Sequence, residues 1–84
     1  MVDKIKNLIN DPIEKEGYIL SNVEYVKEGS LNYLRVFIDK SGFINVDDCV
    51  KVTKLINPIL DKEDPISESY ILEVSSQEKG DVNE

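Results

Sequence analysis

The chain has 84 residues, a net charge of −7 and no histidine. This length predicts one domain with a thin core, since a chain of this size buries roughly 60–65% of its unfolded surface. No apolar run approaches the ~18 residues that a membrane span needs, so no membrane partner is expected. The single cysteine, Cys49, cannot form an intramolecular disulfide, which fits a reducing compartment. The commonest general base near neutral pH is missing, so we expect no enzyme.

The negative charge is concentrated towards the C-terminal end. Residues 1–60 hold nine acidic and eight basic side chains, whereas residues 61–84 hold eight acidic side chains and two lysines. Such a chain repels phosphate backbones, so we expect weak or no direct nucleic-acid binding by this domain. An acidic surface suits a basic protein partner, but it also keeps a protein in solution. Charge by itself does not separate these two interpretations.

The first element expected is a helix. Apolar side chains at helical spacing favour a helix over residues 2–13. Pro12 lies inside this pattern and predicts a kink or a restarted turn, because proline removes one backbone hydrogen bond. Gly17 is suited to cap the end of the helix.

Two strands are expected next. Residues 18–27 and 31–39 are rich in strand-forming side chains, and the turn signal around Gly29 predicts that they pair as a hairpin. On one face of the second strand the alternation places three apolar side chains, Leu34, Val36 and Ile38.

A second helix and a last strand complete the pattern. Asn45 can serve as an N-cap, and the apolar spacing predicts a helix from about residue 46 to residue 60. Residues 61–65 are expected to form a charged loop, and residues 70–76 alternate like a strand. The broad apolar face of the helix comprises Val46, Cys49, Val50, Val52, Leu55, Ile56, Ile59 and Leu60.

The order α-β-β-α-β predicts a two-layer α+β domain, with a three-stranded sheet covered on one face by two helices. This is the topology class of KH domains, which clamp RNA with a Gly-x-x-Gly loop. The four glycines of the chain do not have that spacing. Sequence-specific RNA binding is therefore not expected.

The uncovered face of the sheet is the strongest candidate for a partner-binding surface. Its charged and aromatic side chains form either a plain cross-strand charge ladder or a docking surface. The candidate residues are Glu24, Arg35, Phe37, Asp39 and Glu73. A second candidate is the acidic loop with Asp61, Glu63, Asp64 and Glu68, for which a solvated loop is the simpler interpretation.

Other clusters have simple structural explanations. Cys49 lies on the apolar helix face, so core packing is favoured over reactivity. Asp39, Asp47 and Asp48 flank one loop, but N-capping accounts for the helix pair without a metal, and the calcium-loop spacing is lacking. A solvated helix face is favoured over weak RNA contact for Lys4, Lys6, Lys51 and Lys54.

Three stretches together resemble a known family. They are NVEYVKEG at 22–29, LRVFIDKSGFINVDDC at 34–49 and DKEDPISESYILEVSS at 61–76. In order and spacing they resemble the N-terminal domain of the bacterial ribosome maturation factor RimP. One departure is Phe43, which stands where the family more often has glycine, so the loop before the second helix is expected to differ in shape.

The resemblance implies a cytoplasmic assembly factor without cofactors that binds the free small ribosomal subunit and promotes its maturation. The implied contact is a basic ribosomal protein, and a monomer is favoured over a dimer. The family continues into a C-terminal β-barrel, so residues 1–76 are expected to form the N-terminal domain and residues 77–84 a disordered tail. The alternative is an autonomous interaction module that pairs through a sheet edge or through the exposed sheet face.

Overall fold

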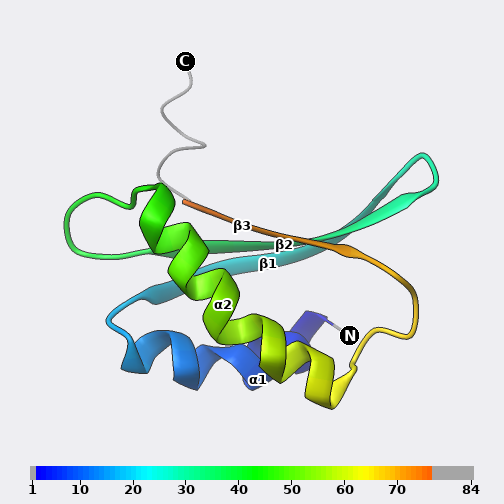
Figure 1. Ribbon diagram of the computed structural model, residues 1–84, viewed down its shortest axis with the longest axis horizontal. Coiled ribbons are helices and arrows are strands. Elements are labelled where there is room, and N and C mark those ends of the chain that lie inside the picture. Colours follow the sequence, from blue (N-terminus) through cyan, green and yellow to red (C-terminus); the bar gives the residue numbers. More distant parts are fainter. Residues whose placement is uncertain (1, 77–84) are drawn as a thin grey trace.

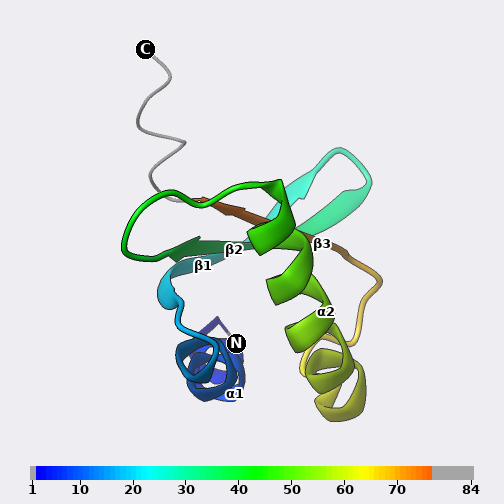
Figure 2. The same cartoon turned by 60° about the vertical axis from the view of Figure 1, so that its left-hand side comes forward.

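The computed structural model describes residues 2–76, which form two helices and three strands in the expected order (Figure 1). The elements are α1 (Val2–Lys15), β1 (Ile19–Glu28), β2 (Leu31–Asp39), α2 (Val46–Glu63) and β3 (Ile71–Ser76). The two helices lie side by side against one face of the sheet, which confirms the predicted two-layer α+β fold (Figure 2). The tail expected over residues 77–84 lies outside the described residues.

The sheet is mixed, and β2 is its central strand. β1 pairs with β2 antiparallel, and β3 pairs with β2 parallel. The turn between β1 and β2 passes through Gly29 at φ 62°, a left-handed conformation that suits glycine. β3 is parallel to β2 because α2 carries the chain back along the sheet before the last strand begins. In the sheet that residues 2–76 form, β1 and β3 are therefore the two edges.

The first helix is longer than expected. α1 continues without interruption through Pro12 to Lys15, so the predicted restart of the helix at the proline is wrong. Full burial of Ile9 and Ile13 on either side of Pro12 offsets the missing backbone hydrogen bond. The cap is as predicted, with Gly17 at φ 91° and its N–H donating to Glu14 O at 3.0 Å.

The second helix begins as predicted and ends later. Asn45 is its N-cap, but α2 runs to Glu63, so residues 61–63 are helical and not a loop. The helix ends at Asp64, whose φ is 45° and whose N–H donates to Leu60 O at 2.8 Å, immediately before Pro65. The charged residues after Leu60 are compatible with an exposed last turn, and proline is the true stop signal.

The core lies between the two helices and β2. Its fully buried side chains come from every fourth helix position and every second position of β2, which confirms the predicted buried face of that strand. They are Ile5, Ile9 and Ile13 of α1, Leu34, Val36 and Ile38 of β2, and Val52, Ile56 and Leu60 of α2.

One end of the expected apolar face of α2 is not in the core. Val46 is 70% exposed and Val50 is 46% exposed, so their expected place on the core-facing side is wrong. The buried positions of α2 follow the line Val52, Ile56 and Leu60, which faces α1 and the sheet. Val46 and Val50 lie to one side of that line, next to β3, which is an edge strand. They remain exposed because the described sheet ends there.

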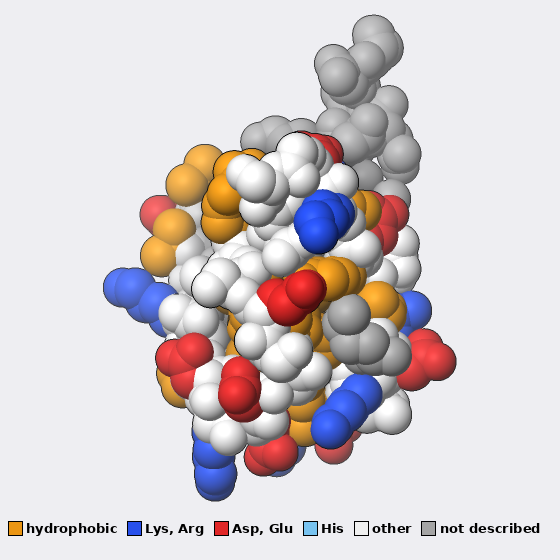
Figure 3. Space-filling model, turned by 90° about the vertical axis from the view of Figure 1, so that its right-hand side faces the viewer, with side chains coloured by type: hydrophobic (Ala, Val, Ile, Leu, Met, Phe, Trp, Pro, Cys, Tyr) orange, Lys and Arg blue, Asp and Glu red, His pale blue; other side chains and the backbone are white. Residues whose placement is uncertain are grey.

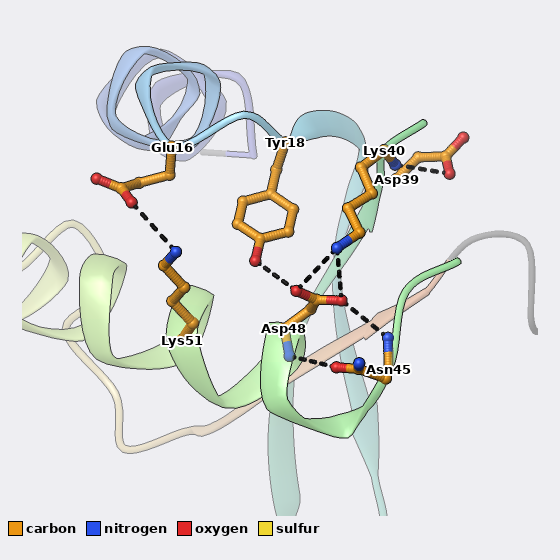
Figure 4. Close-up of polar contacts among 7 residues, drawn as sticks. All are labelled: Glu16, Tyr18, Asp39, Lys40, Asn45, Asp48 and Lys51. Atoms are coloured by element: carbon orange, nitrogen blue, oxygen red, sulfur yellow. Dashed lines mark hydrogen bonds and ion pairs between the residues drawn. The ribbon is translucent and has the colours of Figure 1, made fainter. Parts of the chain in front are cut away.

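A buried carboxylate connects the start of α2 to the rest of the domain (Figure 4). The Tyr18 hydroxyl donates a 2.6 Å hydrogen bond to Asp48 Oδ1, and Lys40 Nζ lies 3.1 Å from Asp48 Oδ2. The N–H of Asn45 donates to Oδ2 at 3.0 Å, and the N–H of Asp48 donates to Asn45 Oδ1 at 2.9 Å. This is a capping box that also recruits one side chain from before β1 and one from after β2.

These contacts change the acidity of both partners. The hydrogen bond from Tyr18, followed by the backbone N–H of Asn45, lowers the pKa of Asp48 to about 2 even though burial opposes the change. The hydrogen bond to Asp48, followed by burial, raises the pKa of Tyr18 to about 12. The charged carboxylate and the neutral phenol are therefore the forms that the fold favours.

Acid should weaken the fold through Asp48. Its folded-state pKa of about 2 lies below the ordinary value, so its contribution is present above about pH 4 and is lost as the pH falls through 2. Asp48→Asn should lower the melting temperature at pH 7, and the difference from the parent should shrink towards pH 2. Thermal unfolding followed by circular dichroism measures this. Asp47→Asn, at an exposed carboxylate in the same turn, is the control; an equal pH dependence there would contradict the assignment.

The packing of α2 is tested by one substitution at two positions. Val52→Ala should cost about 2 kcal/mol of unfolding free energy, because it removes buried methyl groups and leaves a cavity. Val46→Ala should change the unfolding free energy by less than about 0.5 kcal/mol, since the side chain is mostly exposed. Urea unfolding of both variants gives the two values, and equal losses would place Val46 in the core after all.

Candidate functional site

The candidate site lies on the sheet face opposite the helices. Because successive strand residues point to opposite faces, the burial of Leu34 and Val36 towards the helices places Arg35 on the other side. Arg35 is opposite Glu24 of β1 and opposite Glu73 of β3 in the strand register. The structure thus brings three of the five predicted residues into one row across all three strands.

Arg35 is the centre of this row. Its Nε donates to Glu73 Oε1 at 2.9 Å, and one terminal nitrogen donates to Glu28 Oε2 at 3.2 Å. The guanidinium carbon lies 5.2 Å from the centre of the Tyr33 ring, within range of a cation–π contact. The hydrogen bond to Glu73 is the largest cause of a raised pKa of Arg35, so its charge is permanent.

Two predicted residues of this face lie farther along β2. Phe37 is half-buried and occupies the next row, paired with Asn22 and Ser75. Asp39 is the last residue of β2, and its Oδ1 accepts a 2.8 Å hydrogen bond from the N–H of Lys40. The five candidates therefore form a row of three with two residues extending from it, and not one compact cluster.

Sequence reasoning missed Glu28 as a member of the site. It was assigned to the turn, whereas β1 continues through it. The sequence signal that could have identified Glu28 is the alternation of strand residues, because residues 24 and 28 are an even number of positions apart and so share a face. Tyr33 and the exposed Ile71 also lie on this face, next to each other in the register. The face therefore combines four carboxylates and one guanidinium with aromatic and apolar side chains.

The second predicted set does not form a single loop. Asp61 and Glu63 lie in the last turn of α2, Asp64 caps that helix, and Glu68 lies in the segment before β3. Glu68 Oε1 accepts a 3.1 Å hydrogen bond from the Tyr25 hydroxyl. The prediction of an acidic loop is wrong for the helical members, because α2 continues past Leu60.

Part of this set does share a surface depression. Asp61, Asp64 and Glu68 line a hollow of about 570 Å³ between α2 and the segment that leads to β3. Burial, followed by the charges of Asp61 and Asp64, raises the pKa of Tyr70 in its wall. Among the residues that the structure describes, no three histidine, cysteine, aspartate or glutamate side chains are arranged to hold a metal ion.

Basic side chains are paired or dispersed. Lys51 Nζ lies 3.6 Å from Glu16 Oε1, and Lys40 contacts Asp48. On the side of the molecule shown in Figure 3, the lysine and arginine side chains are scattered, with acidic side chains among them. Within residues 2–76, no helix is long and apolar enough to cross a membrane.

Cys49 is only partly in the core. Its side chain is of intermediate exposure and lies in a groove between α2 and β3, together with Val50 and Val74. The expectation of core packing holds for its apolar surroundings but not for full burial.

The element order and the mixed sheet define a two-layer α-β-β-α-β domain, and no helix or strand of residues 2–76 covers the charged face of its sheet. A comparison with known protein families matches residues 8–77 to the RimP N-terminal domain. Because the match covers most of the chain, this chain belongs to the RimP N-terminal domain family, which confirms the resemblance of its three motifs. This is a family of ribosome maturation factors.

The charged row should be dispensable for folding. Glu73→Gln removes an exposed ion pair, which typically contributes less than about 1 kcal/mol. We expect the unfolding free energy of this variant, measured in urea, to fall by no more than that amount. Ser75→Ala, two residues along the same strand face, is the control. A loss several times larger for Glu73→Gln would show that the row holds the sheet together.

Proposed function

We propose that this chain takes part in maturation of the small ribosomal subunit by binding the free subunit in the cytoplasm, without catalysing a reaction. Membership of the RimP N-terminal domain family supports the ribosomal role. The absence of histidine from the sequence agrees with a binding role.

The open sheet face is the surface that we assign to this contact. This face carries four carboxylates and one guanidinium, and the guanidinium is already paired with Glu73 and Glu28. The net electrostatic potential of this face is therefore negative, so the face attracts a basic protein and repels the phosphates of ribosomal RNA. We therefore propose a basic ribosomal protein as the direct partner.

The aromatic and apolar side chains give this face a second way to bind. Tyr33 and Phe37 stand beside Arg35 along β2, and the exposed Ile71 is next to Tyr33. Charge complementarity speeds and orients the encounter, whereas burial of such side chains holds the complex. A basic segment fixed in this way would be kept from incorrect contacts until the subunit is ready for it.

Charge reversal on this face should weaken subunit binding. Glu24→Lys and Glu73→Lys should each reduce affinity for purified free small subunits by about tenfold, which corresponds to ~1.4 kcal/mol. Binding of the parent chain should weaken as salt is raised, because salt screens exposed charges. Sedimentation with free small and large subunits measures both effects.

Glu14→Lys is the matched control, since it makes the same charge change on an exposed position of α1. All three variants should keep the circular dichroism spectrum of the parent. Equal affinity in the parent and both sheet-face variants would exclude this face as the contact. Equal binding to the large subunit would contradict the proposed function.

A further inference from the structure

We propose that the outer edge of β3, with the apolar groove beside it, binds an extended basic segment of a partner protein that adds one strand to the sheet. The inference deepens the proposed function and rests on it for the kind of partner. It assigns a second contact surface, which meets the row around Arg35 at Glu73.

The groove runs between α2 and β3 and has a volume of about 560 Å³. Its walls are mainly apolar: Val46, Cys49 and Val50 lie on α2, and Leu72 and Val74 lie on β3. The two charged lining residues are Lys54 of α2 and Glu73 of β3, so the apolar side chains of an occupant would face Lys54 and its basic side chains would face Glu73. A smaller hollow of about 260 Å³ adjoins it, shares Val46, Cys49 and Val74, and reaches Ile44. Val46 and Val50 are one helical turn apart and are exposed, so an apolar strip follows the strand edge.

The edge beside the groove has the geometry of a strand-binding site. β3 pairs with β2 along one side over Ile71–Ser76, and in the described sheet it is an outermost strand. Its outer side presents main-chain groups to which an extended segment can pair at a spacing of about 4.8 Å. Alternate side chains of such a segment would enter the groove against Val50 and Val74, and the others would lie beside Glu73.

Charge selects the occupant of this edge. Glu73 is the one charged residue of β3, and its side chain is 46% exposed although Arg35 already donates to Oε1. A lysine or arginine on an added strand would become its cross-strand neighbour. A second copy of this chain would instead bring together two chains that each carry a net charge of −7. The favoured occupant therefore alternates apolar and basic residues.

A labelled peptide of alternating lysine and valine tests the inference by fluorescence anisotropy with the 84-residue chain. We expect this peptide to bind and a peptide of alternating glutamate and valine not to bind. Val50→Lys, which places a charge in the groove, and Glu73→Lys should each weaken binding by about tenfold or more. Ile19→Lys is the control: Ile19 is 55% exposed, similar to Val50, but lies on β1 at the opposite edge, and binding should be unchanged.

Backbone methylation of the peptide separates strand pairing from adhesion of side chains. Methyl groups on the valine amides remove the hydrogen-bond donors along one edge of the peptide strand. Methyl groups on the lysine amides remove the donors along its other edge. One methylated peptide should lose binding and the other should keep it, which also reveals the direction of the added strand. Equal binding of both would overturn strand addition.

Three further outcomes complete the test. Self-association in sedimentation equilibrium that Val50→Lys abolishes would overturn the choice of a foreign segment and support a second copy as the occupant. Subunit binding by the parent chain without peptide binding would overturn this inference and leave the proposed function standing. Peptide binding without subunit binding would keep the strand-addition site and reject the proposed function.

Discussion

The carboxylate of Asp48 determines where the second helix lies, and much of the molecular surface follows from that position. The connection before β1 and the connection between β2 and α2 meet there: Tyr18 comes from the first, and Lys40 and Asn45 come from the second. A buried carboxylate left without such partners would be costly, so the fold must bring all three to it. Because α2 begins at this point, most of its apolar face packs on the core. The remainder, Val46 and Val50, is left beside the edge of the sheet.

Local rules were sufficient to predict the elements but not their limits. The alternation of Leu34, Val36 and Ile38 predicted the strand and its buried face. Successive strand residues point to opposite faces, so an apolar residue at every second position identifies the face that is buried. Asn45 predicted the start of α2, since capping depends on neighbours within one turn. The end of α2 was predicted too early, because charge was taken as a loop signal where proline stops the helix.

The sequence pattern could not predict features that depend on contacts between residues distant in the chain. Tyr18 and Asp48 are 30 positions apart, and neither residue carries a local sign of the other. The exposure of Val46 depends on which strand is outermost, and this strand order follows from the crossover of α2. For the candidate site, the alternation located Glu24, Arg35 and Glu73 on one face. It could not show that Glu28 also contacts Arg35, because that contact depends on side-chain conformation.

The mixed sheet also has a consequence for the order in which the domain folds. The β1–β2 hairpin closes through a short turn, whereas β3 can pair with β2 only after more than thirty intervening residues have been organised by α2. Local hairpins form within microseconds, and non-local parallel pairing is intrinsically slower. During synthesis from the N-terminus, β3 is the last of these elements to be made. The nascent domain therefore passes through a stage in which β2, its most apolar strand, presents a bare edge, and this is the stage at which it is most exposed to aggregation.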